Sequence, residues 1–334
     1  MSRNVILGID GGGTYTRVAI TSTEGILLSY VESKGAASIY KDLNAKVNVC
    51  NAIQEVVNQA NCKLEDIVGL AAGVAGLDND SDLEWVRELT HIDGLECSSQ
   101  HVNDAVIAHK GAFLSKPGII AISGTGSIIF GITESGKYIR NYNFHHYAAT
   151  AARFLSYDTV YKIIAGETDR TDSELVEQVL KHFKVKDLAE LAQLGSEGFV
   201  EDSRDRNKQF GDLAPVITDA ALRGSHLAIE ICNQAATAII TGVKLIGSCF
   251  DSETVAVALI GSVVNSVYIK NTINELINIQ AYKKYNVIEP ALPAVLGAIT
   301  MAMEQKGIAL NETVQNNLVK SAAAIFQTCH ETIS

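Results

Sequence analysis

The sequence contains one short pattern twice, and this repeat limits the folds that the chain can adopt. Residues 5–20 read VILGIDGGGTYTRVAI, and residues 118–133 read GIIAISGTGSIIFGIT. An offset of 113 residues (127 − 14) places Thr14 at the position of Ser127. Each copy predicts a strand, a glycine-rich turn and a second strand. The glycines permit positive φ and a close approach of backbone N–H groups to an anion. We therefore expect two lobes, each with one turn, that bind a single polyphosphate.

The two turns carry the residue types that nucleotide binding requires. A carboxylate at a strand end can hold Mg²⁺ directly or through water, which makes Asp10 the predicted metal ligand. A glycine-rich hairpin without a ligand is the alternative for either turn alone, whereas a second copy at a matching place favours phosphate binding. The predicted phosphate-binding residues are Asp10, Gly11, Gly12, Gly13 and Thr14 in the first turn, and Ser123, Gly124, Thr125, Gly126 and Ser127 in the second.

Asp104 is the candidate general base. It follows the predicted strand Glu96–Val102 and opens a helix, and α/β proteins place their chemistry at such strand ends. Phosphoryl transfer needs a group that orients the acceptor hydroxyl and takes its proton, and a carboxylate can do both. Alternatively, Asn103 or Asp104 only caps the helix. The spacing leaves both interpretations open.

Strands alternate with helices along the chain, which indicates an α/β architecture. After the first hairpin and its third strand, Ile67–Val74 is a predicted buried strand. The second lobe restarts with the repeat at Gly118–Thr133, continues with mostly helical sequence, and returns to a strand at Thr254–Ile260. A turn at Gly261–Ser262 follows, of the kind that can pass against a flat ring such as adenine.

Composition and charge exclude several classes of partner. The formal net charge is −11 without a run of basic residues, which argues against nucleic acid and anionic membranes. No uninterrupted apolar stretch approaches the roughly 18 residues of a membrane span. The N-terminus reads as a first strand and not as a signal peptide, so we expect a cytoplasmic protein. The six cysteines form no C-x-x-C pair, which predicts neither disulfides nor a zinc site.

Several motifs together resemble the BadF/BadG/BcrA/BcrD ATPase family. In chain order these motifs are the DGGGT turn, the GVAG loop at 73–76, Asn103–Asp104–Ala105, the SGTGS turn, Gly261–Ser262 and Leu296–Gly297–Ala298. The resemblance covers nearly the whole chain, and length and spacing are similar to the N-acetylglucosamine kinases of the family. It implies an actin-like, hexokinase-like fold with two RNase H-like lobes and ATP in the cleft between them.

The resemblance also implies domains and residue roles. The last helix would return to the first lobe, so the lobes would comprise residues 1–115 with 311–334, and residues 116–310 with a helical insertion. Gly261 and Ser262 would contact adenosine, Asp104 would accept the proton of a sugar hydroxyl, and Ala75 and Gly76 would lie near the sugar. His145 completes the predicted substrate-binding set. A homodimer is common among relatives.

The sequence departs from these kinases where they usually carry Gly-Trp-Gly and then Gly-Asp-Glu-Gly-Ser. Residues 141–147 read NYNFHHY and residues 148–152 read AATAA, so the acidic pair is absent. Loss of a charge-assisted acceptor weakens binding of a sugar hydroxyl by roughly 1.5–3 kcal/mol. Two alternatives follow: a non-catalytic nucleotide-binding regulator, or an ATPase that activates a dehydratase. The activators hold an iron–sulfur cluster through a cysteine where this chain has Tyr147.

The favoured prediction is an ATP- and Mg²⁺-dependent sugar kinase with Asp104 as its base. The predicted acceptor is an amino sugar such as N-acetylglucosamine or N-acetylmuramic acid. The paired turns and Asp104 support this activity, and the absent acidic pair leaves the sugar undefined.

Overall fold

The chain passes from a first structural unit into a second and then returns to the first. The computed structural model describes the backbone of residues 4–331 and the side chains of residues 4–323. The first unit combines residues up to Lys116 with those from Glu289 onward, and the second spans Pro117–Ile288. The predicted return at residue 311 is therefore wrong. Helix α10 (Ala294–Gln305) already belongs to the first unit, because its apolar residues pack against β1 and β4 of that unit.

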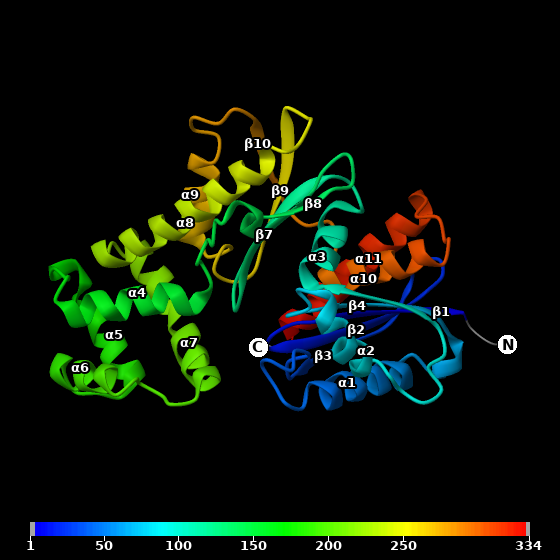
Figure 1. Cartoon of the computed structure of the whole chain (residues 1–334), viewed down its shortest axis with the longest axis horizontal. Coiled ribbons are helices and arrows are strands. Elements are labelled where there is room, and N and C mark those ends of the chain that lie inside the picture. Colours follow the sequence, from blue (N-terminus) through cyan, green and yellow to red (C-terminus); the bar gives the residue numbers. More distant parts are fainter. Residues whose placement is uncertain (1–3, 332–334) are drawn as a thin grey trace. The chain divides into compact units, whose positions relative to one another are not determined.

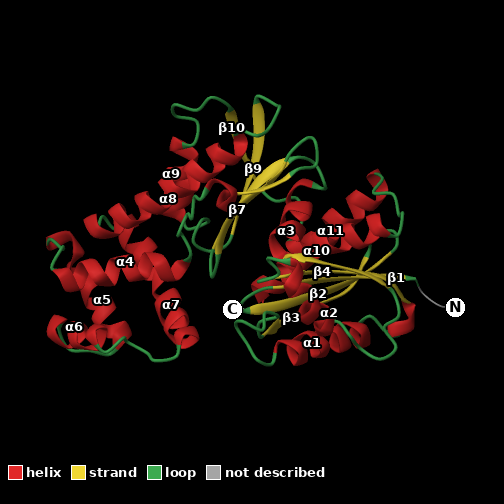
Figure 2. Cartoon of the chain, in the orientation of Figure 1, coloured by secondary structure: helices red, strands yellow, loops and turns green. Residues whose placement is uncertain are grey.

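The first unit is a five-stranded mixed sheet with helices on both faces (Figures 1 and 2). Its strand order is β3-β2-β1-β4-β5; β1, β4 and β5 are parallel, and β2 is antiparallel to both of its neighbours. The elements are β1 (Val5–Gly11), β2 (Tyr15–Ser22), β3 (Leu27–Lys34), α1 (Ala45–Gln59), β4 (Ile67–Val74), α2 (Leu83–Leu89), β5 (Ser98–Asn103), α3 (Asp104–Phe113), α10 and α11 (Glu312–Glu331).

Alternation along β1 explains why both faces of this sheet are covered. Val5, Leu7 and Ile9 point to the face that α1 and α2 cover, whereas Ile6 points to the face that α3, α10 and α11 cover. Successive side chains of a strand point to opposite faces, so an uninterrupted apolar run requires helices on both sides.

The second unit repeats the strand order of the first. Its sheet has the order β8-β7-β6-β9-β10, with β6, β9 and β10 parallel and β7 antiparallel to both of its neighbours. The predicted duplication is therefore present in the sheets themselves. Strand β10 was not predicted. The elements of this sheet are β6 (Gly118–Ser123), β7 (Ser127–Ile132), β8 (Tyr138–Arg140), β9 (Thr254–Ile260) and β10 (Lys284–Ile288), with α9 (Val267–Leu276) between the last two strands.

A helical insertion separates β8 from β9. It comprises α4 (Ala152–Ala165), α5 (Ser173–Phe183), α6 (Leu188–Ser196), α7 (Ser203–Leu222) and α8 (His226–Gly247), and its apolar residues join the core of the second unit. Within the described residues, α8 alone is long and apolar enough to cross a membrane by length and composition. Its buried face packs on β6 and β7 as a core helix.

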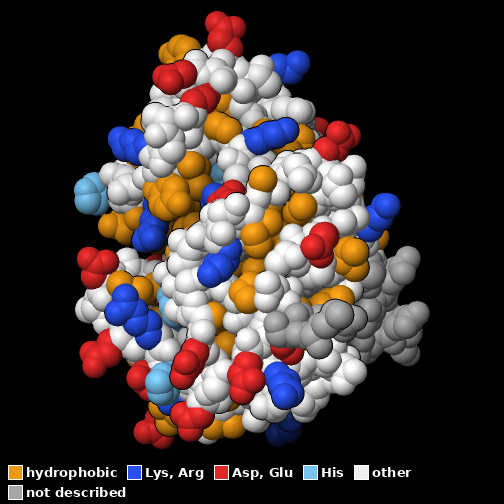
Figure 3. Space-filling view, turned by 90° about the vertical axis from the view of Figure 1, so that its right-hand side faces the viewer, with side chains coloured by type: hydrophobic (Ala, Val, Ile, Leu, Met, Phe, Trp, Pro, Cys, Tyr) orange, Lys and Arg blue, Asp and Glu red, His pale blue; other side chains and the backbone are white. Residues whose placement is uncertain are grey.

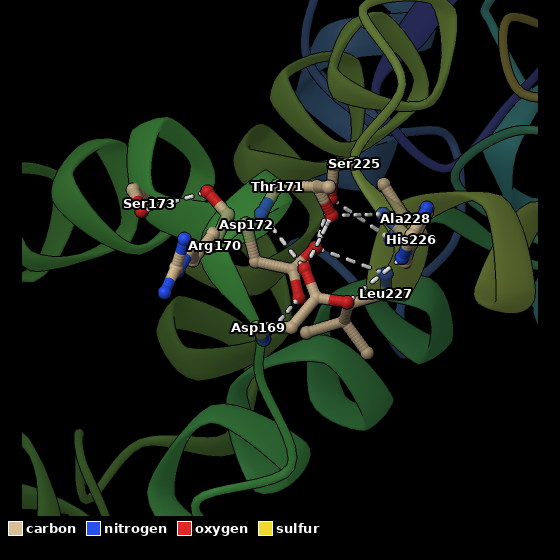
Figure 4. A network of polar contacts seen from close by, with 9 residues as sticks. All are labelled: Asp169, Arg170, Thr171, Asp172, Ser173, Ser225, His226, Leu227 and Ala228. Atoms are coloured by element: carbon tan, nitrogen blue, oxygen red, sulfur yellow. Dashed lines mark hydrogen bonds and ion pairs between the residues drawn. The ribbon is translucent and has the colours of Figure 1, made fainter.

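A polar network fastens two helix starts of this insertion (Figure 4). The buried Asp172 accepts hydrogen bonds from the Ser225 hydroxyl (2.7 Å) and from the Leu227 N–H (3.0 Å). It also accepts one from the Asp169 N–H. Asp169 in turn lies 2.7 Å from Nδ1 of His226. One carboxylate therefore satisfies backbone and side-chain donors at the starts of both α5 and α8.

Candidate active site

The parallel strands of the first unit end at one edge, where most of the predicted catalytic and substrate residues meet. Asp10 on β1 is in register with Gly73 on β4, and Val74 is in register with Asn103 on β5. Directly beyond β4, the Ala75 N–H donates to the Gly11 carbonyl over 2.8 Å. The first glycine turn, the GVAG loop and the start of α3 therefore form one contiguous site.

Close packing, and not positive φ, explains the glycine at position 11 of the first turn. Among the described residues with positive φ, none is Gly11, Gly12 or Gly13, which corrects the expected conformation. A Cβ at Gly11 would instead lie 2.6 Å from the Cβ of Ala37. The Ala37 N–H donates to the Gly12 carbonyl over 3.1 Å. The glycine is needed because the segment after β3 packs directly against the turn.

An ion-pair ladder that was not predicted crosses the first three strands. Arg17 on β2 is the register partner of Asp10 on β1 and of Glu32 on β3. Its guanidinium lies 3.4 Å from Oδ2 of Asp10 and 2.6 Å from Oε2 of Glu32. Burial raises the pKa of Asp10, and the Arg17 charge opposes that rise. Arg17 therefore favours the ionised form of the predicted metal ligand.

Asp104 is the first residue of α3 and is half-buried at the strand edge. Burial, followed by the charges of Asp10 and Asp78, raises its pKa to about 7. A hydrogen bond from the Ala105 N–H opposes the rise. A carboxyl group with a pKa near the working pH is well suited to take up a proton.

Asn103 occupies the N-cap position of α3. It has extended backbone dihedrals, and its Oδ1 accepts a hydrogen bond from the Ala105 N–H over 3.0 Å. Of the two candidate capping residues, Asn103 is therefore the one that caps the helix. Asp104, although it also contacts the Ala105 N–H, is not required to begin the helix.

The loop after β4 forms the side of the site where the sugar was predicted. Gly76 has φ of +91°, and a Cβ there would lie 3.1 Å from both Oγ of Ser38 and the Tyr40 ring. The Tyr40 hydroxyl donates to Oδ1 of Asp82 over 2.8 Å. This hydrogen bond is the largest cause of a pKa of about 2 for Asp82. An exposed tyrosine is thus held beside the predicted residues Ala75 and Gly76.

In the second unit, the Ser123–Ser127 turn packs on the predicted adenosine residues. Gly261 has φ of +108°, and a Cβ there would lie 2.4 Å from the Ser123 carbonyl oxygen. The N–H groups of Val263 and Val264 donate to the same carbonyl. A Cβ at Gly124 would lie 3.5 Å from the Ser262 nitrogen. The structure therefore brings the second turn and Gly261–Ser262 together.

The hydroxyls of the second turn anchor a neighbouring segment. Ser123 Oγ donates to the Thr150 carbonyl, and Ser127 Oγ donates to the Ala148 carbonyl over 3.0 Å. Arg153, which was not predicted, donates from Nη1 to the Thr125 carbonyl over 3.1 Å. The segment without the acidic pair is therefore tied to the turn, and a cation lies beside it.

The register of the two hairpins corrects the predicted alignment of the repeat. Ser123 pairs with Ser127, just as Asp10 pairs with Arg17. Ser127 therefore corresponds to Arg17 and not to Thr14, because the second turn is shorter. The second copy lacks both members of the ion pair, so only the first turn has a carboxylate for a metal.

His145 lies in the second unit, in a left-handed conformation directly after a 3₁₀ turn. Its Nδ1 lies 3.5 Å from the Tyr147 hydroxyl, and the Tyr147 ring stacks on Tyr142. The Tyr142 hydroxyl donates to the Ser127 carbonyl over 3.0 Å. His145 is therefore part of an aromatic segment beside the second turn, in a different unit from Asp104.

Two curated proteins are similar to this chain over most of its length. An N-acetylmuramic acid/N-acetylglucosamine kinase of Clostridium acetobutylicum is 26% identical over 312 residues, which cover 90% of this chain and 98% of that protein. A glucosamine kinase of Vibrio cholerae is 25% identical over 71% of this chain and 78% of its own length.

Solved structures show the same fold. A protein of Chromobacterium violaceum, provisionally assigned as an N-acetylglucosamine kinase, aligns with a TM-score of 0.72 at 19% identity and covers 91% of this chain and 100% of its own. A glucokinase of Streptomyces griseus aligns with a TM-score of 0.57 at 17% identity, covering 90% of this chain and 99% of its own. The predicted actin-like, hexokinase-like fold is confirmed. The model of the BadF/BadG/BcrA/BcrD ATPase family matches residues 7–302, and the chain belongs to this family.

Proposed function

We propose that this protein is an ATP-dependent kinase that phosphorylates a hydroxyl of an amino sugar such as N-acetylglucosamine or N-acetylmuramic acid. The main support for this proposal is the position of Asp104, a half-buried carboxyl group beside the first glycine turn whose pKa is raised to about 7. The curated relatives are named as kinases of amino sugars, which supports the choice of acceptor. A cytoplasmic location and a homodimer stay predictions.

The reaction needs one proton acceptor and several phosphate ligands. Asp104 takes the proton of the acceptor hydroxyl while the sugar oxygen bonds to the γ-phosphorus of ATP. The bond from that phosphorus to the bridging oxygen breaks, and ADP leaves. Backbone N–H groups of the two turns, Gly11–Thr14 and Ser123–Ser127, are proposed to bind phosphate oxygens. Gly261 and Ser262 are proposed to contact the adenosine.

Mg²⁺ fits the donors at the end of β1. The described residues contain no group of three or more His, Cys, Asp or Glu that could hold a metal. Mg²⁺ in kinases is usually bound by one or two carboxylates together with phosphate oxygens and water, and Asp10 supplies such a carboxylate. When bound, Mg²⁺ neutralises charge on the phosphates.

Charge on the surface is consistent with a small-molecule substrate. Acidic and basic side chains are interspersed over the face in Figure 3, and the described residues form no continuous basic patch on that face. The net charge of −11 also disfavours a nucleic-acid partner.

An ADP-release screen tests this function. Wild-type protein and Asp104→Asn are incubated with ATP, Mg²⁺ and, in turn, amino sugars and neutral hexoses. We expect release that depends on an amino sugar and falls by about 100- to 10,000-fold in Asp104→Asn. Undiminished turnover by Asp104→Asn would exclude Asp104 as the base.

A nucleotide-binding regulator is the second candidate. Ala149 and Thr150 stand where these kinases carry the acidic pair, and the neighbouring Ala148 carbonyl accepts a hydrogen bond from the Ser127 hydroxyl. Tight ATP binding by calorimetry without turnover on any sugar would favour this alternative.

A further inference from the structure

A second carboxylate lies beside Asp104 and has no part in the chemistry derived above. Asp78 follows the GVAG loop and is exposed. The Nδ2 group of Asn103 donates to Oδ1 of Asp78 over 3.2 Å and to the Leu77 carbonyl over 3.3 Å. Because Asn103 immediately precedes Asp104, its amide holds Asp78 next to the proposed base.

The backbone around Asp78 is also held in place. Oδ2 of Asp82 accepts hydrogen bonds from the N–H groups of Asp78 and Asn79, each over 3.0 Å. Asp82 is itself buried and bonded to Tyr40 and Trp85. The loop therefore presents the Asp78 carboxylate in a defined position, and a preorganised group loses less entropy when it binds a ligand.

Asp78 belongs to a group of acidic side chains near the start of α3. Its negative charge lies close enough to Asp104 to raise the pKa of that group, and Asp10 adds a third acidic side chain. An ionised carboxylate accepts hydrogen bonds only. A polyhydroxyl ligand offers donors for both groups at once, because neighbouring hydroxyls on a sugar ring are only a few ångströms apart.

We propose that Asp78 orients the acceptor sugar by accepting a hydrogen bond from a hydroxyl other than the one that Asp104 deprotonates, with Asn103 as the residue that positions Asp78. This inference deepens the proposed function and rests on it. It assigns a sugar-binding carboxylate to the first unit in a chain whose second unit lacks the acidic pair of its relatives.

Asp78→Asn tests the proposal against a matched control. Asp80→Asn makes the same change at an exposed residue of the same loop. With the best acceptor from the screen, we expect Asp78→Asn to raise the KM for the sugar about 10- to 100-fold. The KM for ATP should stay within twofold of the wild type, and Asp80→Asn should behave as the wild type.

Monodeoxy analogues of the acceptor separate binding from a structural effect. For the wild type, the KM for the analogue that lacks the contacted hydroxyl should exceed the KM for the full sugar. The factor should be about the one by which Asp78→Asn raises the KM for the full sugar. Asp78→Asn should no longer distinguish that analogue from the full sugar. An equal loss on every analogue, or a normal KM for the sugar, would overturn the proposal.

Asn103→Asp tests the positioning role, since aspartate retains the N-cap function and removes the amide donor. We expect a similar rise in the sugar KM, and little further effect of Asp78→Asn in that background. Full additivity of the two substitutions would overturn the role of Asn103. Absence of sugar turnover by the wild type would overturn the proposed function itself, whereas turnover that is insensitive to Asp78 would overturn this inference alone.

Discussion

Asp104→Asn should stabilise the fold at neutral pH while it removes activity. The folded-state pKa of about 7 exceeds the ordinary value of 3.8, so folding favours the protonated acid. The protonated Asp104 therefore contributes its full stabilisation of the fold below about pH 4, and this contribution is lost as the pH rises through about 7. A difference of 3.2 units (7 − 3.8) corresponds to roughly 4 kcal/mol above pH 8. The neutral amide of asparagine avoids this loss at every pH.

Trp85 makes the measurement specific to the first unit. It is the only tryptophan of the chain and lies on α2, so its fluorescence during urea unfolding reports that unit. We expect Asp104→Asn and the wild type to have similar free energies of unfolding at pH 4. Asp104→Asn should be the more stable by up to about 4 kcal/mol at pH 8. Asp80→Asn, at an exposed residue of the same unit, is the matched control. A stability difference that stays constant from pH 4 to 8 would refute the reasoning.

Three further expectations concern packing, the polar network and the metal. A Cβ at Gly297 would lie 2.0 Å from the Ile107 carbonyl oxygen, so Gly297→Ala should destabilise the first unit by about 1–3 kcal/mol or prevent folding. Gly211→Ala, where the nearest atom is 4.0 Å away, should be neutral or stabilising; equal losses in urea unfolding would contradict the steric argument. Asp172→Ala should lower the thermal midpoint of the helical insertion and cost about 2 kcal/mol or more, since two buried donors lose their acceptor; an unchanged circular-dichroism melt would contradict it. Asp10→Asn should raise the Mg²⁺ concentration needed for half-maximal ADP release, and EDTA should stop release; metal-independent turnover would remove the proposed role of Asp10.

Local signals predicted much of the fold. The strands Ile67–Val74 and Thr254–Ile260 have the predicted bounds, because each is an apolar run with clear ends. Strand β10 was missed because Lys284–Ile288 is a short edge strand with exposed polar residues. Only its parallel pairing with β9 defines it as a strand.

The site residues that sequence reasoning missed depend on contacts between distant segments. Arg17 meets Asp10 only through the hairpin register, although a cation on the strand after an acidic turn was a usable signal. Asp78 meets Asn103 across 25 residues because β4 and β5 pair in parallel. Arg153 contacts the Thr125 carbonyl of the second turn across a similar separation in the sequence. No local pattern encodes the last two pairings.

The discontinuity of the first unit has a consequence for synthesis on the ribosome. Helix α10 covers one face of the first sheet, but the 172 residues from Pro117 to Ile288 (288 − 117 + 1) are translated between the two parts of that unit. At about 5–20 residues per second, this takes roughly 10–35 s. During that interval Ile6 and Ala71, which α10 later covers, lack their partner, whereas the second unit is complete before the first. In the nascent chain, the later half of the duplicated architecture can therefore finish folding before the earlier half.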